Sequence, residues 1–429
     1  MVGKQLPPQL APTRQKKAGR GPRSKRGSVG DPSFDISTRL VHAGERQVPA
    51  AIPVSTPIYA SVTYTYGSMA EVDKVFGGEM PGYVYSRYGN PTLTALEIAV
   101  HSLEGGLAAS AFGSGMAALH AALIACDIAS GCTVLASQDL YGATINLLNT
   151  VFASFGVNTI MADYSDLGAL EKKAREVRPR IMIAETVSNP LLKVSDLACC
   201  AEIAHAAGAR LIVDNTFATP YLCRPFDLGA DMVVHSATKY LAGHGDVMGG
   251  IAIAREEPQH NALRTVMKLA GGIMSPYDAH EILRGLKTLA LRVERQCANA
   301  RTIAEKLSAD RRVARVHYPA LATGDARRKL ERTLRPNYAG AMVAIELANN
   351  TKDGAFRFMD ALRLVVRSTS LGDVFTSTLH PATASHREVA PARRRALGIT
   401  DGLVRLSIGI EHVDDILADL NQALDASAA

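Results

Sequence analysis

The sequence predicts an α/β protein with a mostly parallel central sheet and a smaller α/β domain toward its C-terminal end. The first observation is that short apolar runs alternate with amphipathic segments from about residue 90 onward. The second is a helical stretch at 278–307, after which the strand signals become sparser. Because strands joined by a helical crossover pair in parallel, the order βαβαβ predicts a sheet covered by helices on both faces.

Each segment is assigned from the spacing of its apolar residues and from the polar residues that flank it. The predicted helices cover the segment after residue 115 and residues 95–103, 167–177, 197–207, 278–307 and 413–424. The predicted strands cover 133–136, 180–185, 211–213, 232–234, 340–347 and 403–408. We therefore divide the chain into a leader (1–33), an N-terminal arm (34–90), a large domain (91–280) and a C-terminal domain (281–429).

The composition is that of a large water-soluble protein. The 429 residues include no Trp, and no apolar run reaches the roughly 18 residues of a membrane span, so no membrane partner is expected. The six cysteines show neither a CxxC pair nor a zinc spacing. They indicate reduced thiols and a cytoplasmic location. The histidines likewise lack the spacing of metal ligands, so we predict no metal site.

The positive charge is concentrated at the N-terminus. Residues 1–31 carry eight Lys and Arg and one acid, a net +7, which leaves about −1 of the total +6 for the remainder. This Pro- and Gly-rich leader has no apolar periodicity and is predicted to be disordered. It is interpreted as a start-site extension, a solubilising tail or a transit peptide. A rival interpretation of the whole chain is a non-catalytic protein that binds nucleic acid through the leader.

Polar side chains follow two neighbouring predicted strands. The run 211–213 ends on Asp214, and the run 232–234 leads into the sequence HSATK, which contains Ser236, Thr238 and Lys239. In open α/β sheets, ligands bind outside the carboxyl ends of the strands. A carboxylate, a lysine and two hydroxyls at that edge are the set that pyridoxal 5′-phosphate (PLP) requires. The lysine bonds to the cofactor, the carboxylate holds the pyridine nitrogen protonated, and the hydroxyls receive the phosphate.

A glycine-rich turn precedes the helix after residue 115. Its sequence AFGSGMAA, at 111–118, contains Gly115 and Met116. Small residues allow a phosphate to approach the free backbone amides at a helix N-terminus, where the helix dipole also favours an anion. The turn is a poor dinucleotide fingerprint, because it lacks a third glycine and the acid about 20 residues later.

Three sequence motifs around these residues resemble those of a known enzyme family. The segments DNTFATPYL (214–222), HSATKY (235–240) and GHGDVMGG (243–250) resemble the Cys/Met-metabolism, or trans-sulfuration, PLP-dependent enzymes. The family contains cystathionine γ-synthases and γ-lyases, methionine γ-lyases and O-acylhomoserine sulfhydrylases, and the last two groups are the nearest. The resemblance covers residues 37–424. It implies the type I fold of PLP-dependent transferases, PLP as cofactor and an amino acid as substrate.

The resemblance implies how the cofactor phosphate is held. Gly115 and Met116 would give backbone donors to it, and Ser236 and Thr238 would add hydroxyls. The segment YVYSRYGNPT (83–92) resembles the family motif whose Tyr and Arg reach the cofactor phosphate of a neighbouring subunit. By that resemblance the 34–90 arm would bring Tyr85 and Arg87 to the neighbour's site. A homotetramer built from two active dimers is therefore expected.

Four further residues take their expected roles from the resemblance alone. Tyr141, in DLYGAT, would stack on the cofactor ring and protonate the leaving group. Asn189, in ETVSNP, would lie near the phenolic oxygen of the cofactor. Arg405, in GLVRLSIG, would bind the α-carboxylate of the substrate, with Ser370 in the loop that faces it. Lys239 and Tyr141 would be the catalytic residues.

Three departures from family patterns bear on the reaction. Thr369 replaces the Glu that cystathionine-handling members carry before Ser-Leu-Gly. Ala143 replaces the Cys of methionine γ-lyases, and Lys268 stands in a Lys-Asp position of that group. We therefore predict γ-elimination on a four-carbon L-amino acid with a γ-heteroatom, giving 2-oxobutanoate or another vinylglycine-derived product and ammonia. The alternatives are γ-replacement by an O-succinyl- or O-acetylhomoserine sulfhydrylase or by a cystathionine γ-synthase.

Overall fold

The computed structural model describes residues 51–428, which form two units. In the described residues, the smaller unit contains 51–57 and 65–82 and the larger one 58–64 and 83–428. The smaller unit contains helix α2 (Met69–Phe76), which begins where the Ser68 hydroxyl accepts a hydrogen bond from the Glu71 amide. The predicted leader at 1–33 lies outside the described residues, as do residues 34–50 of the predicted arm. The boundaries at 33, 90 and 280 stay predictions.

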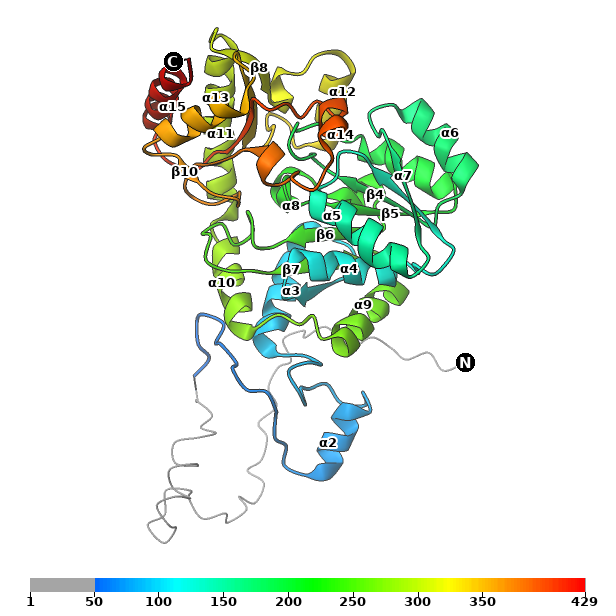
Figure 1. Ribbon diagram of the computed structural model, residues 1–429. Helices are drawn as coiled ribbons and strands as arrows, with labels where there is room; N and C mark the ends of the chain where they lie inside the picture. The colour runs from blue at the N-terminus through cyan, green and yellow to red at the C-terminus, as the bar shows by residue number, and fades with distance from the viewer. Residues whose placement is uncertain (1–50, 429) are drawn as a thin grey trace. The chain divides into compact units, whose positions relative to one another are not determined.

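The larger unit contains a seven-stranded sheet in the order β1-β7-β6-β5-β4-β2-β3 (Figure 1). Its strands are β1 (Ala108–Phe112), β2 (Thr133–Ser137), β3 (Asn158–Ala162), β4 (Ile181–Glu185), β5 (Arg210–Asp214), β6 (Met232–Ser236) and β7 (Gly250–Ala254). From β6 to β3 every neighbouring pair is parallel, whereas β7 pairs antiparallel with both β1 and β6. The mostly parallel sheet is thus confirmed.

Helices cover both faces of this sheet, because alternate residues of its strands enter two different cores. Val134 and Ala136 of β2 pack with the residues of α4 and α9, whereas Leu135 packs with those of α3, α6 and α7. The helical segments of this part of the chain are α3 (Pro91–Glu104), α4 (Gly115–Ala125), α5 (Gly142–Asn146), η1 (Leu147–Phe152), α6 (Leu167–Val177), α7 (Leu197–Ala206), α8 (Thr219–Leu222), η2 (Pro225–Leu228) and α9 (Glu257–Ala270). Strands buried on both faces explain the continuous apolar runs in the sequence.

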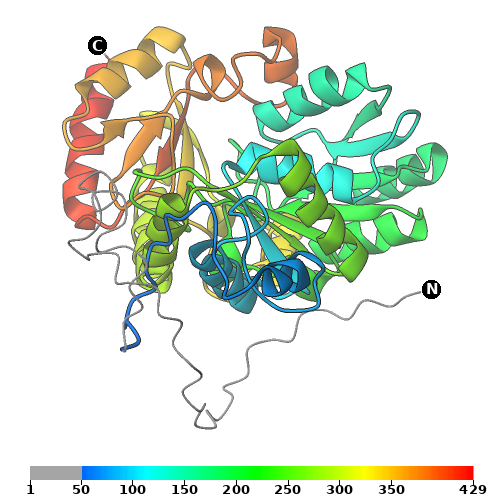
Figure 2. The same ribbon diagram turned by 90° about the horizontal axis from the view of Figure 1, so that it is seen from below.

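The second sheet has the order β10-β11-β12-β9-β8, and only its β10–β11 pair is parallel. Its strands are β8 (Val313–His317), β9 (Met342–Leu347), β10 (Val366–Arg367), β11 (Ser377–Leu379) and β12 (Leu403–Ser407). The accompanying helical segments are α10 (Pro276–Leu286), α11 (Leu289–Ser308), η3 (Pro319–Leu321), α12 (Gly324–Thr333), α13 (Lys352–Ala361), η4 (Pro381–Thr383), α14 (Pro391–Ala396) and α15 (Val413–Ala428). Figure 2 shows the orange and red C-terminal segments gathered beside the cyan and green first sheet.

The helical stretch predicted at 278–307 is two helices, α10 and α11, with a break at Lys287 and Thr288. The Gly285 carbonyl causes the break, because it accepts hydrogen bonds from the Thr288 amide and from the Arg292 guanidinium. A carbonyl engaged in this way does not continue the i→i−4 ladder of a helix. The spacing of apolar residues does not reveal that this carbonyl is hydrogen-bonded to the side chain of Arg292.

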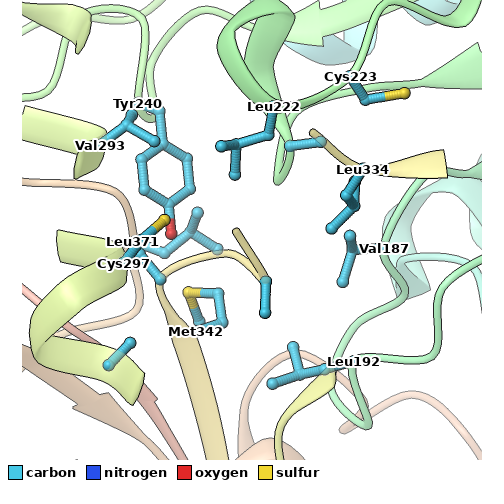
Figure 3. Close-up of a cluster of buried hydrophobic side chains, with 14 of the residues drawn as sticks. Val187, Leu192, Leu222, Cys223, Tyr240, Val293, Cys297, Leu334, Met342 and Leu371 are labelled. Atoms are coloured by element: carbon cyan, nitrogen blue, oxygen red, sulfur yellow. The ribbon is translucent and has the colours of Figure 1, made fainter. Parts of the chain in front are cut away.

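A shared core joins the two sheets. Figure 3 shows part of it, in which the Tyr240 ring lies near Val293 of α11 and near Cys297 and Leu371. Burial raises the pKa of the Cys297 thiol to about 12, which makes it an unreactive packing group. All six cysteines are free thiols, and four of them are buried. Every helix within residues 51–428 is too short or too polar to cross a membrane.

The core predicts the cost of removing a buried side chain. Leu135 is fully buried in β2, so Leu135→Ala should lower the free energy of unfolding by about 2–5 kcal/mol, through lost apolar burial and the cavity left behind. Urea unfolding followed by circular dichroism measures this loss. Leu364→Ala is the matched control, because Leu364 is 40% exposed, and it should cost less than about 1 kcal/mol. Equal losses in both variants would contradict the assignment of β2 to the core.

Candidate active site

The carboxyl ends of β4, β5 and β6 meet at one edge of the first sheet. They carry Glu185, Asp214 and Ser236, and the strand register places Glu185 directly opposite Asp214. The Asp214 carboxylate accepts a hydrogen bond from the Thr216 amide (2.9 Å), and the Thr216 hydroxyl accepts one from the Ser236 amide (2.8 Å). The ends of β5 and β6 are therefore held together, as the sequence predicts.

Within residues 51–428, neither Asp214 nor Glu185 has a cationic partner at hydrogen-bond distance. Burial raises the pKa of Asp214. Burial raises the pKa of Glu185 well above its usual value, and the neighbouring charge of Asp214 raises it further. Because the pKa of Glu185 is shifted further upward than that of Asp214, Asp214 is the more readily ionised of the two. A protonated ring nitrogen placed beside Asp214 would relieve this unfavourable burial.

The glycine-rich turn lies against Ser236. The Ser114 hydroxyl caps α4 by accepting a hydrogen bond from the Ala117 amide (3.1 Å), so the amides of Gly115 and Met116 belong to the open first turn. A Cβ atom at Gly115 would lie 2.9 Å from the Ser236 Cβ and 3.1 Å from its hydroxyl oxygen. Glycine therefore lets the N-terminus of α4 pack directly against Ser236, so the open amides and the Ser236 hydroxyl lie side by side, where both can donate to an anion.

Thr238 and Lys239 follow in the loop after β6. The Thr238 hydroxyl donates to the Gly249 carbonyl (3.2 Å) and accepts from the Gly249 amide (3.0 Å), which closes the loop. The Lys239 amine donates to the Ser370 hydroxyl (3.2 Å) and makes no ion pair. Burial lowers the pKa of Lys239, the charge of Arg405 lowers it further, and the charge of Asp373 opposes them; the net downward shift makes the nucleophilic amine easier to form.

Arg405 is a buried guanidinium that forms no salt bridge in the part of the chain that the structure describes. It is 2% exposed, on β12 of the second sheet. One nitrogen donates to the Asn189 side-chain oxygen (3.0 Å), another donates to the Ser370 carbonyl (3.2 Å), and Nε has no partner. Burial lowers the pKa of Arg405 to about 10. A carboxylate bound here would supply the missing charge and hydrogen bonds.

Tyr141 begins helix α5 and is 41% exposed. Its backbone amide donates to the Glu185 carboxyl group (2.6 Å), which ties it to the sheet edge. Its phenol is near enough to Arg405 to act on the charge of that side chain. The structure thus brings Tyr141, Asn189, Asp214, Lys239 and Arg405 into one linked set.

Tyr85 and Arg87 form a separate group. The Arg87 guanidinium donates to the Lys268 carbonyl (2.7 Å) and lies over the rings of Tyr85 and Tyr88, at 5.6 and 5.0 Å from their centres. Within residues 51–428, neither Tyr85 nor Arg87 forms a hydrogen bond or an ion pair with Lys239. That these two residues bind the cofactor phosphate of a neighbouring subunit stays a prediction.

Sequence reasoning missed three buried groups at or behind the site. Glu185 ends the predicted strand at 180–185, and that position was the available signal. Glu104 lies 2.8 Å from His235, and both side chains are fully buried. Asp373 is 1% exposed, beside the Ser370 loop. Long-range contacts define the last two, and local patterns do not report them.

Two other features lie apart from these residues. A groove of about 980 Å³ is lined by strands β8 and β9 of the second sheet, which give Arg315, His317 and Glu346, and by the loop of Lys193 and helix α14 with Arg395. None of the predicted site residues lines it. Within residues 51–428, no group of three or more His, Cys, Asp or Glu side chains is arranged to hold a metal ion.

The arrangement fits PLP by its own geometry. Asp214 is a buried carboxylate that forms no salt bridge within residues 51–428, and Gly115 lets the start of α4 lie directly against Ser236. Lys239 supplies an amine whose pKa is lowered. Arg405 supplies a guanidinium whose Nε has no hydrogen-bond partner among the described residues. These are the donors that the ring nitrogen, phosphate and aldehyde of the cofactor require.

Comparison with known proteins agrees with this arrangement. Residues 37–425 match the family described as Cys/Met metabolism PLP-dependent enzymes. The chain is 41% identical, over 398 residues, to an L-methionine γ-lyase of Pseudomonas putida, which covers 92% of this chain and 98% of the relative. It is 39% identical to an O-succinylhomoserine sulfhydrylase of Pseudomonas aeruginosa, covering 92% of this chain and 96% of the relative.

The fold has the same relatives. A crystal structure of cystathionine γ-synthase from Xanthomonas oryzae pv. oryzae in complex with cystathionine matches with a TM-score of 0.82 and 37% identity. The match covers 87% of this chain and 94% of that one. The predicted type I fold, the cofactor and the enzymatic nature of the chain are thus confirmed, and the interpretation as a non-catalytic nucleic-acid-binding protein is set aside. The chain belongs to the Cys/Met-metabolism PLP-dependent enzymes.

Proposed function

We propose that this enzyme catalyses γ-elimination on a four-carbon L-amino acid that carries a heteroatom substituent at Cγ. With water, the substrate gives 2-oxobutanoate, ammonia and the protonated leaving group. The observation that carries the proposal is the buried, anion-free guanidinium of Arg405, which is linked to Lys239 through Ser370. A site of this kind selects a substrate with an α-carboxylate and holds its Cα beside an amine.

The residues around the cofactor divide its binding between them. Ser236, Thr238 and the amides of Gly115 and Met116 would hold the phosphate, and Asp214 would hold the ring nitrogen. When bound, PLP supplies an electron sink for the bonds at Cα. Lys239 would anchor the cofactor through its amine, whose lowered pKa favours the nucleophilic form.

The remaining residues act on the amino acid. Arg405 would bind its carboxylate, with Asn189 and the Ser370 carbonyl fixing the orientation of the guanidinium. Once released, the Lys239 amine is placed to move a proton from Cα and then one from Cβ. Loss of the Cβ proton allows the γ-substituent to leave with its bonding electron pair. Tyr141 would give that group its proton.

The relatives support elimination first and replacement second. The methionine γ-lyase of P. putida favours a lyase, and Thr369 in place of Glu disfavours cystathionine as substrate. Ala143 and Lys268 make the leaving-group pocket differ from that of a typical methionine γ-lyase. The second candidate is O-succinylhomoserine sulfhydrylase, which the relative of P. aeruginosa favours. Cystathionine γ-synthase, the activity of the Xanthomonas structure, is a further replacement reaction.

Assembly and location belong to the same proposal. The placement of Tyr85 and Arg87 away from Lys239 supports a site completed by a neighbouring subunit, and family resemblance extends this to a homotetramer of two active dimers. We also propose a cytoplasmic enzyme, on the grounds of its free thiols. The expected partners are small amino acids, and neither a membrane nor a nucleic acid is among them.

The role of Arg405 is tested with Arg405→Ala. Without the guanidinium the substrate carboxylate loses its counter-charge, so kcat/KM should fall roughly 10²–10³-fold while the visible absorbance of the bound cofactor remains. The control is an amine that lacks the α-carboxylate, because its slow turnover should change little in the variant. Equal losses for the amine and the amino acid would argue against a carboxylate-binding role.

The reaction is tested with a substrate panel. Methionine, homocysteine, cystathionine, O-acylhomoserines and other γ-substituted amino acids are each assayed with and without sulfide. We expect 2-oxobutanoate without sulfide, because elimination needs no second substrate. Homocysteine formed from an O-acylhomoserine at much higher kcat/KM would favour the sulfhydrylase instead. Pyruvate as the main keto acid would mean β-elimination.

The shared site is tested by mixing two inactive variants, Arg87→Ala and Lys239→Ala. In a hybrid dimer one site has both wild-type residues and the other has neither, so random exchange should make about a quarter of all sites active. Activity is measured after subunit exchange has been verified by mass. Each variant taken alone through the same exchange is the control. No recovery would indicate a site built within one chain.

A further inference from the structure

The loop that contains Ser370 packs directly on the chain segment that contains Lys239. The Ser370 hydroxyl is 3.2 Å from the Lys239 amine, and the Val374 amide donates to the Gly243 carbonyl (3.0 Å). A Cβ atom at Gly372 would lie 2.7 Å from the Tyr240 nitrogen, so no side chain separates the two segments there. Asp373 is therefore fixed beside the segment that follows Lys239.

Asp373 is a buried acid that forms no salt bridge among the described residues. It is 1% exposed, and neither of its carboxylate oxygens has a partner among the described residues. Its backbone is held, because the Gln296 side chain donates to the Asp373 carbonyl (2.8 Å). A carboxylate left unpaired in the interior is costly, so a nearby positive charge is needed to stabilise it.

The titratable groups that face Asp373 come from two elements, the loop after β6 and helix α11. Lys239, with Tyr240, lies in the loop after β6, and His244 and Asp246 lie further along the same loop. Arg292 of α11 completes the set; it is 4% exposed, and its hydrogen bonds go to the carbonyls of Tyr240, Leu241 and Gly285 and to the Thr288 hydroxyl. Asp246 is exposed, so water screens its charge.

We propose that Asp373 is a positioning residue that acts on the reaction through Lys239, as the counter-charge that stabilises the protonated form of the Lys239 nitrogen. The proposal rests on the proposed function, in which Lys239 moves protons at Cα and Cβ. A group that both takes and returns a proton needs its two forms close in free energy. Burial and Arg405 disfavour the protonated form, and Asp373 opposes both.

The directions of the pKa shifts agree with this geometry. Burial and then the charge of Arg405 lower the pKa of Lys239, while Asp373 raises it. Burial raises the pKa of Asp373, the charge of Lys239 lowers it, and the Ser370 hydroxyl lowers it as well. Removing the Asp373 charge leaves only influences that lower the pKa of the Lys239 nitrogen. Protonation of that nitrogen should then require a lower pH.

The test is a pH titration of the visible absorbance of the holoenzyme, which reports protonation of the Lys239 nitrogen in its bond to the cofactor. In Asp373→Asn the midpoint should move to lower pH by about one unit, the effect of losing a nearby opposite charge. Asp373→Ser is a second neutral variant with a smaller side chain, and it should move the midpoint in the same direction. Asp246→Asn is the matched control, because it removes an exposed carboxylate of the same loop region and should leave the midpoint unchanged.

The outcomes separate an electrostatic role from a structural one. An unchanged midpoint in both neutral variants would overturn the proposal, and so would an equal shift in Asp246→Asn. A residue that only packs the loop would alter thermal stability without moving the midpoint. Since the titration needs no turnover, the substrate panel can fail while this result stands, and the reverse also holds.

Discussion

The parallel register of β4, β5 and β6 is the constraint on which the site depends. Parallel strands end at the same edge, so Glu185, Asp214 and Ser236 reach one place from positions far apart in the sequence. The hydrogen bonds through Thr216 then hold the ends of β5 and β6 together. A slip of one residue in this pairing would turn Asp214 to the other face and remove the carboxylate from the site.

Several charged side chains at and around the site are buried without a salt-bridge partner among the described residues. Asp214, Lys239, Arg405 and Asp373 each lack a salt-bridge partner among the described residues, although exposed side chains of this chain form many salt bridges. Such groups destabilise a fold when they stand alone. Ligands that carry complementary charges explain two of them, because a protonated ring suits Asp214 and a carboxylate suits Arg405, while Asp373 and Lys239 face each other.

Local patterns predicted the frame and the first pair of site residues. The apolar runs before Asp214 and Ser236 are short, buried and followed by polar residues, so their strands and shared edge could be inferred from spacing alone. Tyr141, Asn189 and Arg405 came from the family resemblance, because nothing local marks a guanidinium as unpaired. The antiparallel strand β7 was missed, since its partners β1 and β6 are set by long-range pairing. Asp373 was also missed, because its contact with the Lys239 loop is set by long-range packing that a local sequence pattern does not reveal.

Arg292 has a mechanical consequence for the enzyme. Its guanidinium donates hydrogen bonds to the carbonyls of Tyr240, Leu241 and Gly285. The loop that carries the reactive lysine and the junction between α10 and α11 are thereby fastened by a single side chain. Any hinge motion of the second sheet at that junction would drag the lysine loop with it. The position of Lys239 therefore depends on the junction between α10 and α11 as well as on the sheet that precedes its loop.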